Sequence, residues 1–193
     1  MHDALIHGVG MIVQESGTVP GITVAENMFL NDSRRFSKRG FVLGSEMVKA
    51  AQRALDEIGA NHIDARTVTG TLDMMDRKLV EVAKVMLHDP QVLVVDETTT
   101  ALSQHGRDII YGLMERMKKE DKAVVFISHD LDEIIDKCDT LTVLRDGKII
   151  RTFEKEDFDP DLIRTSMIGR QLQGDYYRSD VDATHFSRVA VEV

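Results

Sequence analysis

The sequence predicts an α/β protein with a mainly parallel sheet and an inserted helical region. Between residues 91 and 137, apolar strand patterns alternate with amphipathic helical patterns, which is typical of a parallel sheet. Another apolar run, at residues 9–13, predicts a further strand. The mainly helical stretch at residues 23–88 separates this strand from the next one at 92–95, so we expect it to form a helical subdomain.

Local signals support the individual elements. Thr23 followed three residues later by Glu26 has the pattern of a capping box, which marks the start of a helix. Asp146-Gly147 between two apolar runs is a strong signal for a hairpin turn. In chain order we expect a strand at 9–13, helices at 23–30, 45–58 and 76–87, a strand at 92–95, a helix at 103–119, a strand at 123–127, a short helix at 131–137 and a hairpin at 141–153.

The composition favours a soluble protein with a real core. Hydrophobic residues make up 42% of the 193 residues and charged residues 30%. No apolar run approaches the roughly 18 residues needed to span a bilayer, and Asp3 argues against a signal peptide. The single cysteine, Cys138, excludes an internal disulfide. We place it on the apolar side of a short helix, as a buried thiol rather than a nucleophile.

The net charge of −9 argues against nucleic acid as the main partner, because phosphate binding needs a basic surface. One local cluster is basic and has Phe36 and Phe41 interleaved with it. Its members are Arg34, Arg35, Lys38 and Arg39. We interpret the cluster as a solvated loop, with base stacking by the two phenylalanines as the alternative.

Two of the predicted strands end in polar groups that suit chemistry. One is followed by Asp96-Glu97 and the other by Ser128-His129-Asp130. Ligands of an open parallel sheet bind outside the carboxyl ends of its strands, so these groups indicate a metal–phosphate site. Asp96 would hold Mg²⁺, Glu97 would polarise a water molecule, and His129 would sense a terminal phosphate. Taken singly, the carboxylates could instead cap a helix, and Ser-His-Asp could be a capping turn.

Three motifs in this order resemble the ATP-binding cassette (ABC) ATPases. The run Asp-Glu-Thr-Thr-Thr-Ala-Leu-Ser, from Asp96 to Ser103, is similar to the Walker B and D-loop run of that family, usually Asp-Glu-Pro-Thr-x-Ala-Leu. Upstream, the strand at 9–13 leads into Gln14, which resembles the Q-loop, and His129 stands at the switch position. The resemblance covers nearly the whole chain. It implies a P-loop NTPase-like fold with ATP and Mg²⁺ as cofactors.

The resemblance also implies a role for each residue. Gln14 would contact Mg²⁺ and the attacking water through its amide oxygen, and Asp96 would bind Mg²⁺, mostly through water. Glu97 would be the general base or orient the water, and His129 would hydrogen-bond the γ-phosphate. Ser103, at the end of the D-loop run, is a further nucleotide-binding candidate. Taken alone, Gln14 could be a surface amide in a loop.

Shorter matches point to the double-cassette ATPases of monosaccharide importers of the ribose, galactose and autoinducer-2 type. They lie at residues 24–27, 80–84 and 167–170. The end of the chain agrees, because residues 176–188 are linker-like and residues 189–193 resemble the first strand of a second cassette.

This narrower resemblance implies four regions and a set of partners. The regions are the core strand and Q-loop at 1–22, the helical subdomain with its signature at 23–90, the ATPase core at 91–172, and a linker with the first strand of a second cassette at 173–193. The implied partners are a second nucleotide-binding cassette, transmembrane permease subunits and, indirectly, a periplasmic sugar-binding protein. The implied location is the cytoplasmic face of the membrane, as a peripheral subunit.

The sequence departs from the family pattern in its phosphate-binding elements. It contains no G-x-x-x-x-G-K-[ST] loop, whose backbone N–H groups and lysine hold the phosphates. We therefore expect a cassette that lacks the N-terminal part of its core and is inactive in isolation. Thr98 stands where the family has proline, which should mainly alter the rigidity of the turn.

The family signature is also altered. Asp73 brings negative charge to a triphosphate, and Met75 adds bulk where the family has a glycine that lets backbone approach closely. We expect the composite site that this segment completes to be degenerate. In place of Leu-Ser-Gly-Gly-Gln the chain has Leu72-Asp73-Met74-Met75-Asp76.

Two functions from different classes compete. The first is an ATP-hydrolysing cassette, in fragment form, of a sugar-import transporter. The second is a non-catalytic regulatory or structural half-cassette that docks a partner cassette or a membrane subunit. A different P-loop enzyme, such as a small-molecule kinase, is disfavoured by the helical insertion at 23–88 and by His129 at the switch position.

Overall fold

The computed structural model describes residues 2–14, 17–30, 32–38, 41–42 and 44–168. The chain divides into two compact units, the first ending at Lys137 and the second beginning at Cys138. The predicted linker and second-cassette strand, at 173–193, lie outside the described residues, and the four predicted region boundaries stay predictions.

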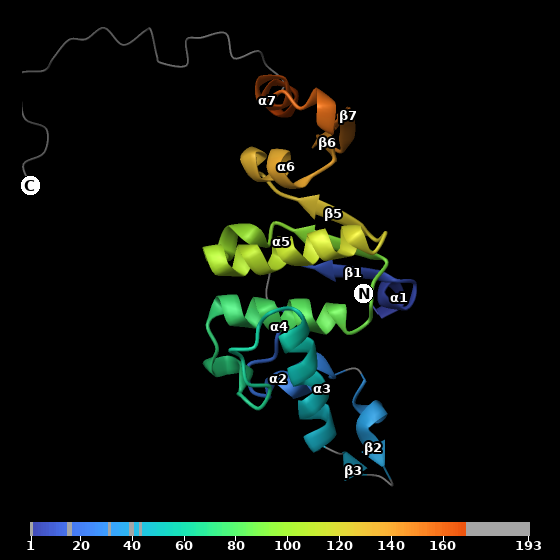
Figure 1. Cartoon of the computed structure of the whole chain (residues 1–193), viewed down its shortest axis with the longest axis vertical. Coiled ribbons are helices and arrows are strands. Elements are labelled where there is room, and N and C mark those ends of the chain that lie inside the picture. Colours follow the sequence, from blue (N-terminus) through green and yellow to red (C-terminus); the bar gives the residue numbers. More distant parts are fainter. Residues whose placement is uncertain (1, 15–16, 31, 39–40, 43, 169–193) are drawn as a thin grey trace, which may run out of the picture. The chain divides into compact units, whose positions relative to one another are not determined.

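A parallel sheet organises the first unit (Figure 1). Its three strands lie in the spatial order β1-β4-β5, so that β4 is central. The strands are β1 (Val9–Ile12), β4 (Val92–Asp96) and β5 (Ala123–Ile127). They confirm the three predicted strands to within one residue.

One face of this sheet carries the core. Ile12, Leu93 and Val95 lie on this face, and each is at most 1% exposed. The helix α4 (Met74–Met86) packs against β1, and α5 (Gln104–Lys119) packs against β5. Figure 1 shows the two helices running side by side along the sheet.

β1 passes so close to α4 that its second residue, Gly10, has no room for a side chain. A Cβ at Gly10 would lie 2.5 Å from Cγ1 of Val85 in α4, nearer than packed carbon atoms approach. The short helix α1 (His2–Ile6) precedes β1 and packs beside it. It was not predicted from the sequence.

The opposite face of the sheet holds apolar side chains that are open to solvent. The strand register sets Met11, Val94 and Val125 side by side on this face. Met11 is 36% exposed, Val125 48% and Ile127 44%. Parallel sheets are normally covered on both faces. This exposed sheet face is therefore an apolar surface of the kind that invites association.

The region between β1 and β4 is mainly helical, which confirms the predicted helices. Thr23 caps the first of them: its hydroxyl accepts a 3.2 Å hydrogen bond from the Glu26 N–H, and the Glu26 carboxylate accepts one of 2.7 Å from the Thr23 N–H. These bonds confirm the capping box. The bond from the Thr23 N–H, followed by one from its hydroxyl, to the Glu26 carboxylate lowers the pKa of Glu26. The elements are α2 (Val24–Met28), η1 (Ser33–Phe36), β2 (Ser37–Lys38), β3 (Phe41–Val42), α3 (Gly44–Glu57), η2 (Thr69–Thr71) and α4.

The basic cluster is not the loop that the sequence suggested. Arg34 and Arg35 are exposed, but they belong to the 3-10 turn η1. Phe36 packs edge-on against Phe29 with the ring centroids 4.6 Å apart. Phe36 is therefore part of the hydrophobic packing rather than a free platform for a base. Arg39 lies outside the described residues.

Two 3-10 turns and two helices complete the part of the chain that the structure describes. They are η3 (Thr99–Ala101), α6 (Leu131–Lys137), η4 (Lys155–Asp157) and α7 (Pro160–Ile168). The bounds of α6 are those predicted. The interpretation of Cys138 was wrong, because α6 ends at Lys137 and Cys138 follows it, partly exposed. The helix α7 was not predicted, and its Ile163 is fully buried.

The second unit contains the predicted hairpin. Its strands are β6 (Thr140–Arg145) and β7 (Lys148–Glu154), paired antiparallel. Asp146 and Gly147 connect them with φ angles of 51° and 72°, the positive values that a tight hairpin turn requires. Arg145 donates a 2.8 Å hydrogen bond to the carbonyl of Ser166, which ties the hairpin to α7.

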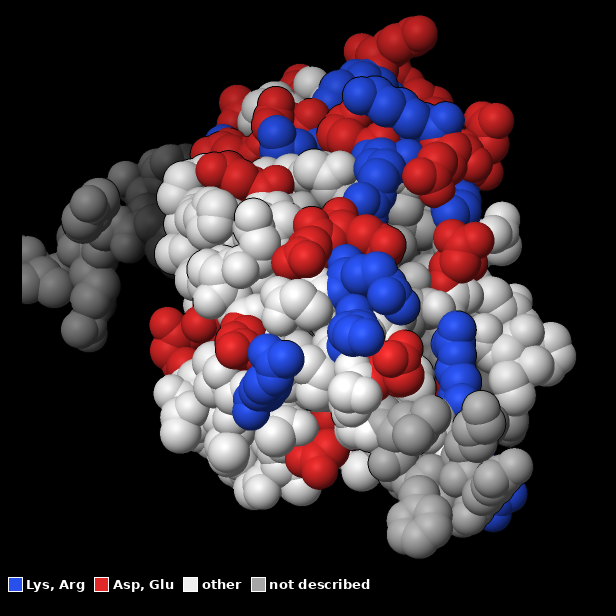
Figure 2. Space-filling model, turned by 60° about the horizontal axis from the view of Figure 1, so that its bottom comes forward, with Lys and Arg blue, Asp and Glu red and all other residues white. Residues whose placement is uncertain are grey.

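Charged side chains of both signs share the surface. On the face drawn in Figure 2, Lys and Arg are interspersed with Asp and Glu and form no continuous basic stripe. Within the described residues, no helix is long and apolar enough to cross a membrane.

We predict that the exposed sheet face drives self-association of the purified chain. Val125→Lys puts a charge on this face at a position that is 48% exposed, so it should weaken association without unfolding the protein. Sedimentation velocity over a range of concentrations measures the change. As a control, Val95→Lys on the fully buried face should unfold the chain. Equal association of V125K and the unsubstituted chain would assign it to another surface.

Candidate functional site

The carboxyl ends of the three strands bring the predicted residues to one edge of the sheet. Asp96 ends β4 and pairs with Ile127, the last residue of β5. Glu97 and His129 follow these two strands on neighbouring chain segments. Gln14 lies two residues beyond the end of β1, the other neighbour of β4.

Glu97 leaves the strand in a strained conformation. Its φ is +44°, in the left-handed region that residues other than glycine rarely adopt. Its N–H donates a 2.9 Å hydrogen bond to the carbonyl of Ile127, which holds the end of β4 against the end of β5. Strain of this kind costs about 1–3 kcal/mol and concentrates at functional sites.

The turn brings the Glu97 side chain to His129. Nδ1 of His129 lies 3.4 Å from Oε1 of Glu97. The Glu97 side chain is 34% exposed and that of His129 67%, so both are accessible to a ligand. A carboxylate that can take a proton and an imidazole that can donate a hydrogen bond thus stand together at the sheet edge.

Asp96 and Gln14 carry side-chain oxygens near the carboxyl ends of two adjacent strands. Asp96 is partly buried and Gln14 is exposed. Mg²⁺ is usually bound by one or two protein oxygens together with water and substrate phosphates. In the described parts of the chain, no three His, Cys, Asp or Glu side chains could hold a metal ion by themselves. Side-chain oxygens such as those of Asp96 and Gln14 are of the type that Mg²⁺ accepts as ligands.

Thr98, which replaces the usual proline, does more than change the stiffness of the turn. It is 1% exposed, and its hydroxyl lies 3.1 Å from the carbonyl oxygen of Asp96 and 3.5 Å from that of Ile12. The hydroxyl therefore bridges the ends of β4 and β1, a contact that proline lacks the donor to make. The sequence offered no signal for it beyond the departure from the family pattern.

Glu133 is a residue that sequence reasoning missed. Its Oε2 accepts hydrogen bonds of 3.1 Å from Thr99 and 2.8 Å from Ser128. Its Oε1 accepts a short hydrogen bond from the hydroxyl of Tyr111 in α5. Burial, followed by this bond to Glu133, raises the pKa of Tyr111 well above its usual range. One carboxylate thus connects the turn after Glu97 with the residue before His129.

The capping interpretation of Ser-His-Asp is right for two of its three residues. Oδ1 of Asp130 accepts hydrogen bonds from the N–H groups of Asp132 and Glu133 at the start of α6. Oγ of Ser128 accepts a 3.0 Å bond from the N–H of Asp130. The side chain of His129, between them, takes no part in these bonds and contacts Glu97.

The altered signature forms a second group, with Ser103. Asp73 is the N-cap of α4 and accepts a 2.8 Å hydrogen bond from the N–H of Asp76. Ser103 is the N-cap of α5, and its Oγ lies 2.8 Å from the sulfur of Met75. Leu72 is partly buried against the core, whereas Met74 is 65% exposed. The segment therefore joins the starts of two helices.

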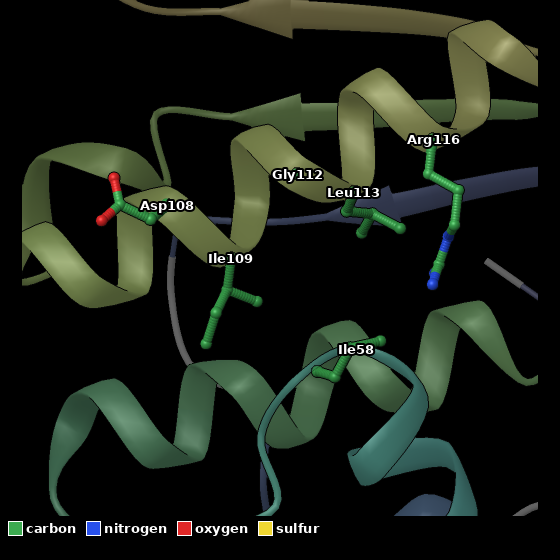
Figure 3. Close-up of a pocket in the computed structure, with 6 residues that line it drawn as sticks. All are labelled: Ile58, Asp108, Ile109, Gly112, Leu113 and Arg116. Atoms are coloured by element: carbon green, nitrogen blue, oxygen red, sulfur yellow. The ribbon is translucent and has the colours of Figure 1, made fainter.

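Two hollows lie elsewhere on α5. Figure 3 shows one of about 250 Å³, in which Ile109 and Leu113 extend toward Ile58, with Asp108 and Arg116 at opposite ends. The other, of about 350 Å³, lies beside Glu133. It is lined by Thr99, Thr100, Arg107, Tyr111, Asp130, Asp132 and Glu133. Of the residues at the predicted strand ends, only Asp130 lines one of these two hollows; Gln14, Asp96, Glu97 and His129 line neither.

Comparison with known proteins assigns these features to a family. The family model described as ABC transporter matches residues 2–100. The chain is 33% identical over 175 residues to the arabinose import ATP-binding protein AraG of Chromohalobacter salexigens. The matched region covers 90% of this chain and 35% of that protein. It is 36% identical over 165 residues to the ribose import ATP-binding protein RbsA 2 of Agrobacterium fabrum, covering 86% and 32%. The chain spans about a third of the length of these curated relatives.

Solved structures of ATP-binding cassettes share the fold. One, an ADP conformation of a cassette from an ABC transporter, superposes with a TM-score of 0.65 at 22% identity, over 87% of this chain and 71% of that one. Another, a dimeric post-hydrolysis state bound to ADP and Pi, gives a TM-score of 0.63 at 24% identity, over 78% and 64%. These similarities confirm the predicted fold class of a P-loop NTPase with a parallel sheet and helices.

Removing the Glu133 carboxylate should loosen the sheet edge. We expect Glu133→Ala to lower the free energy of unfolding by about 1–3 kcal/mol, because three hydroxyl groups lose their acceptor. It should also lower the pKa of Tyr111, although burial continues to raise it. Urea unfolding and ultraviolet titration measure the two effects. Asp132→Ala, at an exposed neighbouring carboxylate, is the control and should change stability little. If Glu133→Ala had the same free energy of unfolding as Asp132→Ala, the central role of Glu133 would be contradicted.

Proposed function

Because this chain belongs to the ABC transporter family, we propose that it is part of the ATP-binding subunit of a sugar-import transporter. The complete protein would couple hydrolysis of MgATP to transport. The observation that carries this proposal is the contact of Glu97 with His129 at the carboxyl ends of adjacent strands, beside Asp96. The names of the arabinose- and ribose-import relatives support sugar as the class of cargo.

Each residue at the sheet edge would have one task. Asp96 and Gln14 would hold Mg²⁺, which when bound neutralises phosphate charge. Glu97 would orient the attacking water and accept its proton, which suits a carboxylate that is two-thirds shielded from solvent. His129 would donate a hydrogen bond to the γ-phosphate, and its contact with Glu97 would keep the two groups at a constant spacing.

We propose the same regions and partners that the sequence implied. Residues 1–22 and 91–172 would form the cassette core, residues 23–90 its helical subdomain, and residues 173–193 a link to a second cassette. Further partners would be transmembrane permease subunits and, through them, a periplasmic sugar-binding protein. The assembly would sit at the cytoplasmic face of the membrane.

The altered signature would leave one composite ATP site degenerate. Asp73 presents a carboxylate where the family has a serine, and that carboxylate is already engaged in capping α4. Met75 is engaged with Ser103. Neither offers the hydrogen-bond donors that a partner's γ-phosphate needs.

A non-catalytic half-cassette is the second candidate. The observation that favours it is the lack of a G-x-x-x-x-G-K-[ST] run in the sequence. Without that loop, phosphates would meet Asp96, Glu97 and Asp130 without compensating amides and lysine. In this case the chain would dock a partner cassette or a membrane subunit and would not turn over ATP.

We predict opposite effects of two changes on the ATPase activity of the complete protein. Glu97→Gln should lower the turnover number roughly 100-fold or more, because the general base is lost. Asp73→Ser with Met75→Gly should raise it, since a serine hydroxyl and a closer backbone replace charge and bulk; one such contact is worth about 2.7–4 kcal/mol. Steady-state phosphate release measures both.

Asp132→Asn is the control for these assays, because Asp132 is exposed and outside the proposed site. Unchanged turnover in E97Q would exclude Glu97 as the general base. A fall in the D73S/M75G variant would show that residues 72–76 do not face nucleotide.

The isolated chain of 193 residues should bind MgATP weakly and not hydrolyse it. The reason is electrostatic, since several carboxylates would surround the triphosphate with no phosphate-binding loop to offset them. Isothermal titration calorimetry with MgATP measures the affinity. A dissociation constant in the micromolar range would show that the chain builds a nucleotide site unaided.

A further inference from the structure

A buried ion pair lies on α4, one turn beyond the altered signature. Lys78 is 5% exposed and Glu81 9%, which places both among the buried residues of the described chain. Nζ of Lys78 lies 2.7 Å from Oε2 of Glu81. The two residues are three apart on a helix, so they share one face.

Each partner of the pair makes a further contact with the segment after β1. Nζ of Lys78 donates a 2.7 Å hydrogen bond to the carbonyl of Val13. Oε1 of Glu81 accepts a short hydrogen bond from the N–H of Gly17. Val13 and Gly17 stand on either side of Gln14 in the sequence. The pair therefore attaches Val13 and Gly17, which flank Gln14 in the sequence, to α4.

Stability alone does not account for charges at this place. Taking two charges out of water is costly, and well-packed apolar residues at such positions often leave a protein equally or more stable. What an apolar pair cannot supply is a hydrogen-bond donor at one position and an acceptor at the other. Lysine only donates hydrogen bonds and a carboxylate only accepts them. The Val13 carbonyl accepts a hydrogen bond and the Gly17 N–H donates one, so each charge matches its backbone partner.

We propose that Lys78 and Glu81 are positioning residues that, through Val13 and Gly17, hold Gln14 in register with α4. This proposal rests on the proposed function, in which Gln14 contacts Mg²⁺. Because the altered signature lies at the start of α4, with Asp73 as its N-cap, a displacement of this end of the helix would be passed to Val13 and Gly17. The residues proposed to face a partner's nucleotide and the residue proposed to face the chain's own Mg²⁺ would then move together.

Hydrogen exchange of single backbone amides tests the attachment in the intact chain. The Gly17 amide reports on the pair, and the Val19 amide is the internal control, because it donates to Oδ1 of Asn27 and not to the pair. In Lys78→Met with Glu81→Met, we expect the Gly17 amide to exchange about tenfold faster or more. The Val19 amide should keep its rate, and the melting temperature should not fall.

Two further variants distinguish the placement of the hydrogen-bond donor and acceptor from the mere presence of an ion pair. Lys78→Glu with Glu81→Lys keeps an ion pair but sets a carboxylate against the Val13 carbonyl and an ammonium against the Gly17 N–H. We expect it to lose the Gly17 protection as the apolar pair does. Glu81→Gln keeps an acceptor oxygen and should retain most of the protection. Unchanged Gly17 exchange in the apolar and reversed pairs would overturn the proposal and leave the ion pair a role in helix stability only.

The complete protein adds a kinetic readout. There the apolar pair should lower the turnover number with little change in KM for ATP, because it frees Gln14 without touching the nucleotide. A change in KM alone would contradict the positioning role. Failure of this proposal leaves the loss of activity in E97Q intact, whereas failure of the proposed function would appear as full activity in E97Q.

Discussion

The parallel pairing of β4 with a strand on each side is the interaction on which the rest of the structure depends. It places the ends of β1, β4 and β5 at one edge, so that three segments far apart in the sequence emerge together. The bond from the Glu97 N–H to the Ile127 carbonyl continues this pairing one residue past β4. Because Glu97 itself has a positive φ, in the left-handed region, its side chain reaches His129.

The edge is held together by polar contacts that cross between strands. Thr98 bridges the ends of β4 and β1, and Glu133 connects the turn after Glu97 with Ser128. The Lys78–Glu81 pair attaches Val13 and Gly17, which follow β1, to α4. Buried polar groups of this kind are costly unless each is satisfied, and in the described residues no buried side-chain nitrogen or oxygen lacks a partner.

The altered signature shows how a structural role and a chemical role can be separated at the same residues. Asp73 is a good N-cap, so α4 starts where a helix should, and Ser103 does the same for α5. Met75 fills the space between the two helix starts. Under the proposed function, Asp73 and Met75 would not supply the donors and the close backbone approach that a phosphate requires. The helix starts would then be preserved while the chemistry at this point differs.

The sequence by itself determined the elements whose causes are local. The apolar runs gave β4 and β5, the Thr23–Glu26 pattern gave the start of α2, and Asp146-Gly147 gave the hairpin, because each depends on residues a few positions apart. The polar residues at strand ends also located Asp96, Glu97 and His129 at one edge, since parallel strands must end together.

Only the tertiary structure decided the contacts between distant segments. The sequence could not show that Phe36 packs on Phe29 or that Thr98 reaches Ile12. Nor could it show that Glu133 accepts hydrogen bonds from three hydroxyl groups. The hydrogen bonds that join the buried ion pair on α4 to Val13 and Gly17 were equally out of its reach. Such contacts follow from how the helices lie on the sheet, and helix packing is set by the summed fit of many side chains, which no local pattern encodes.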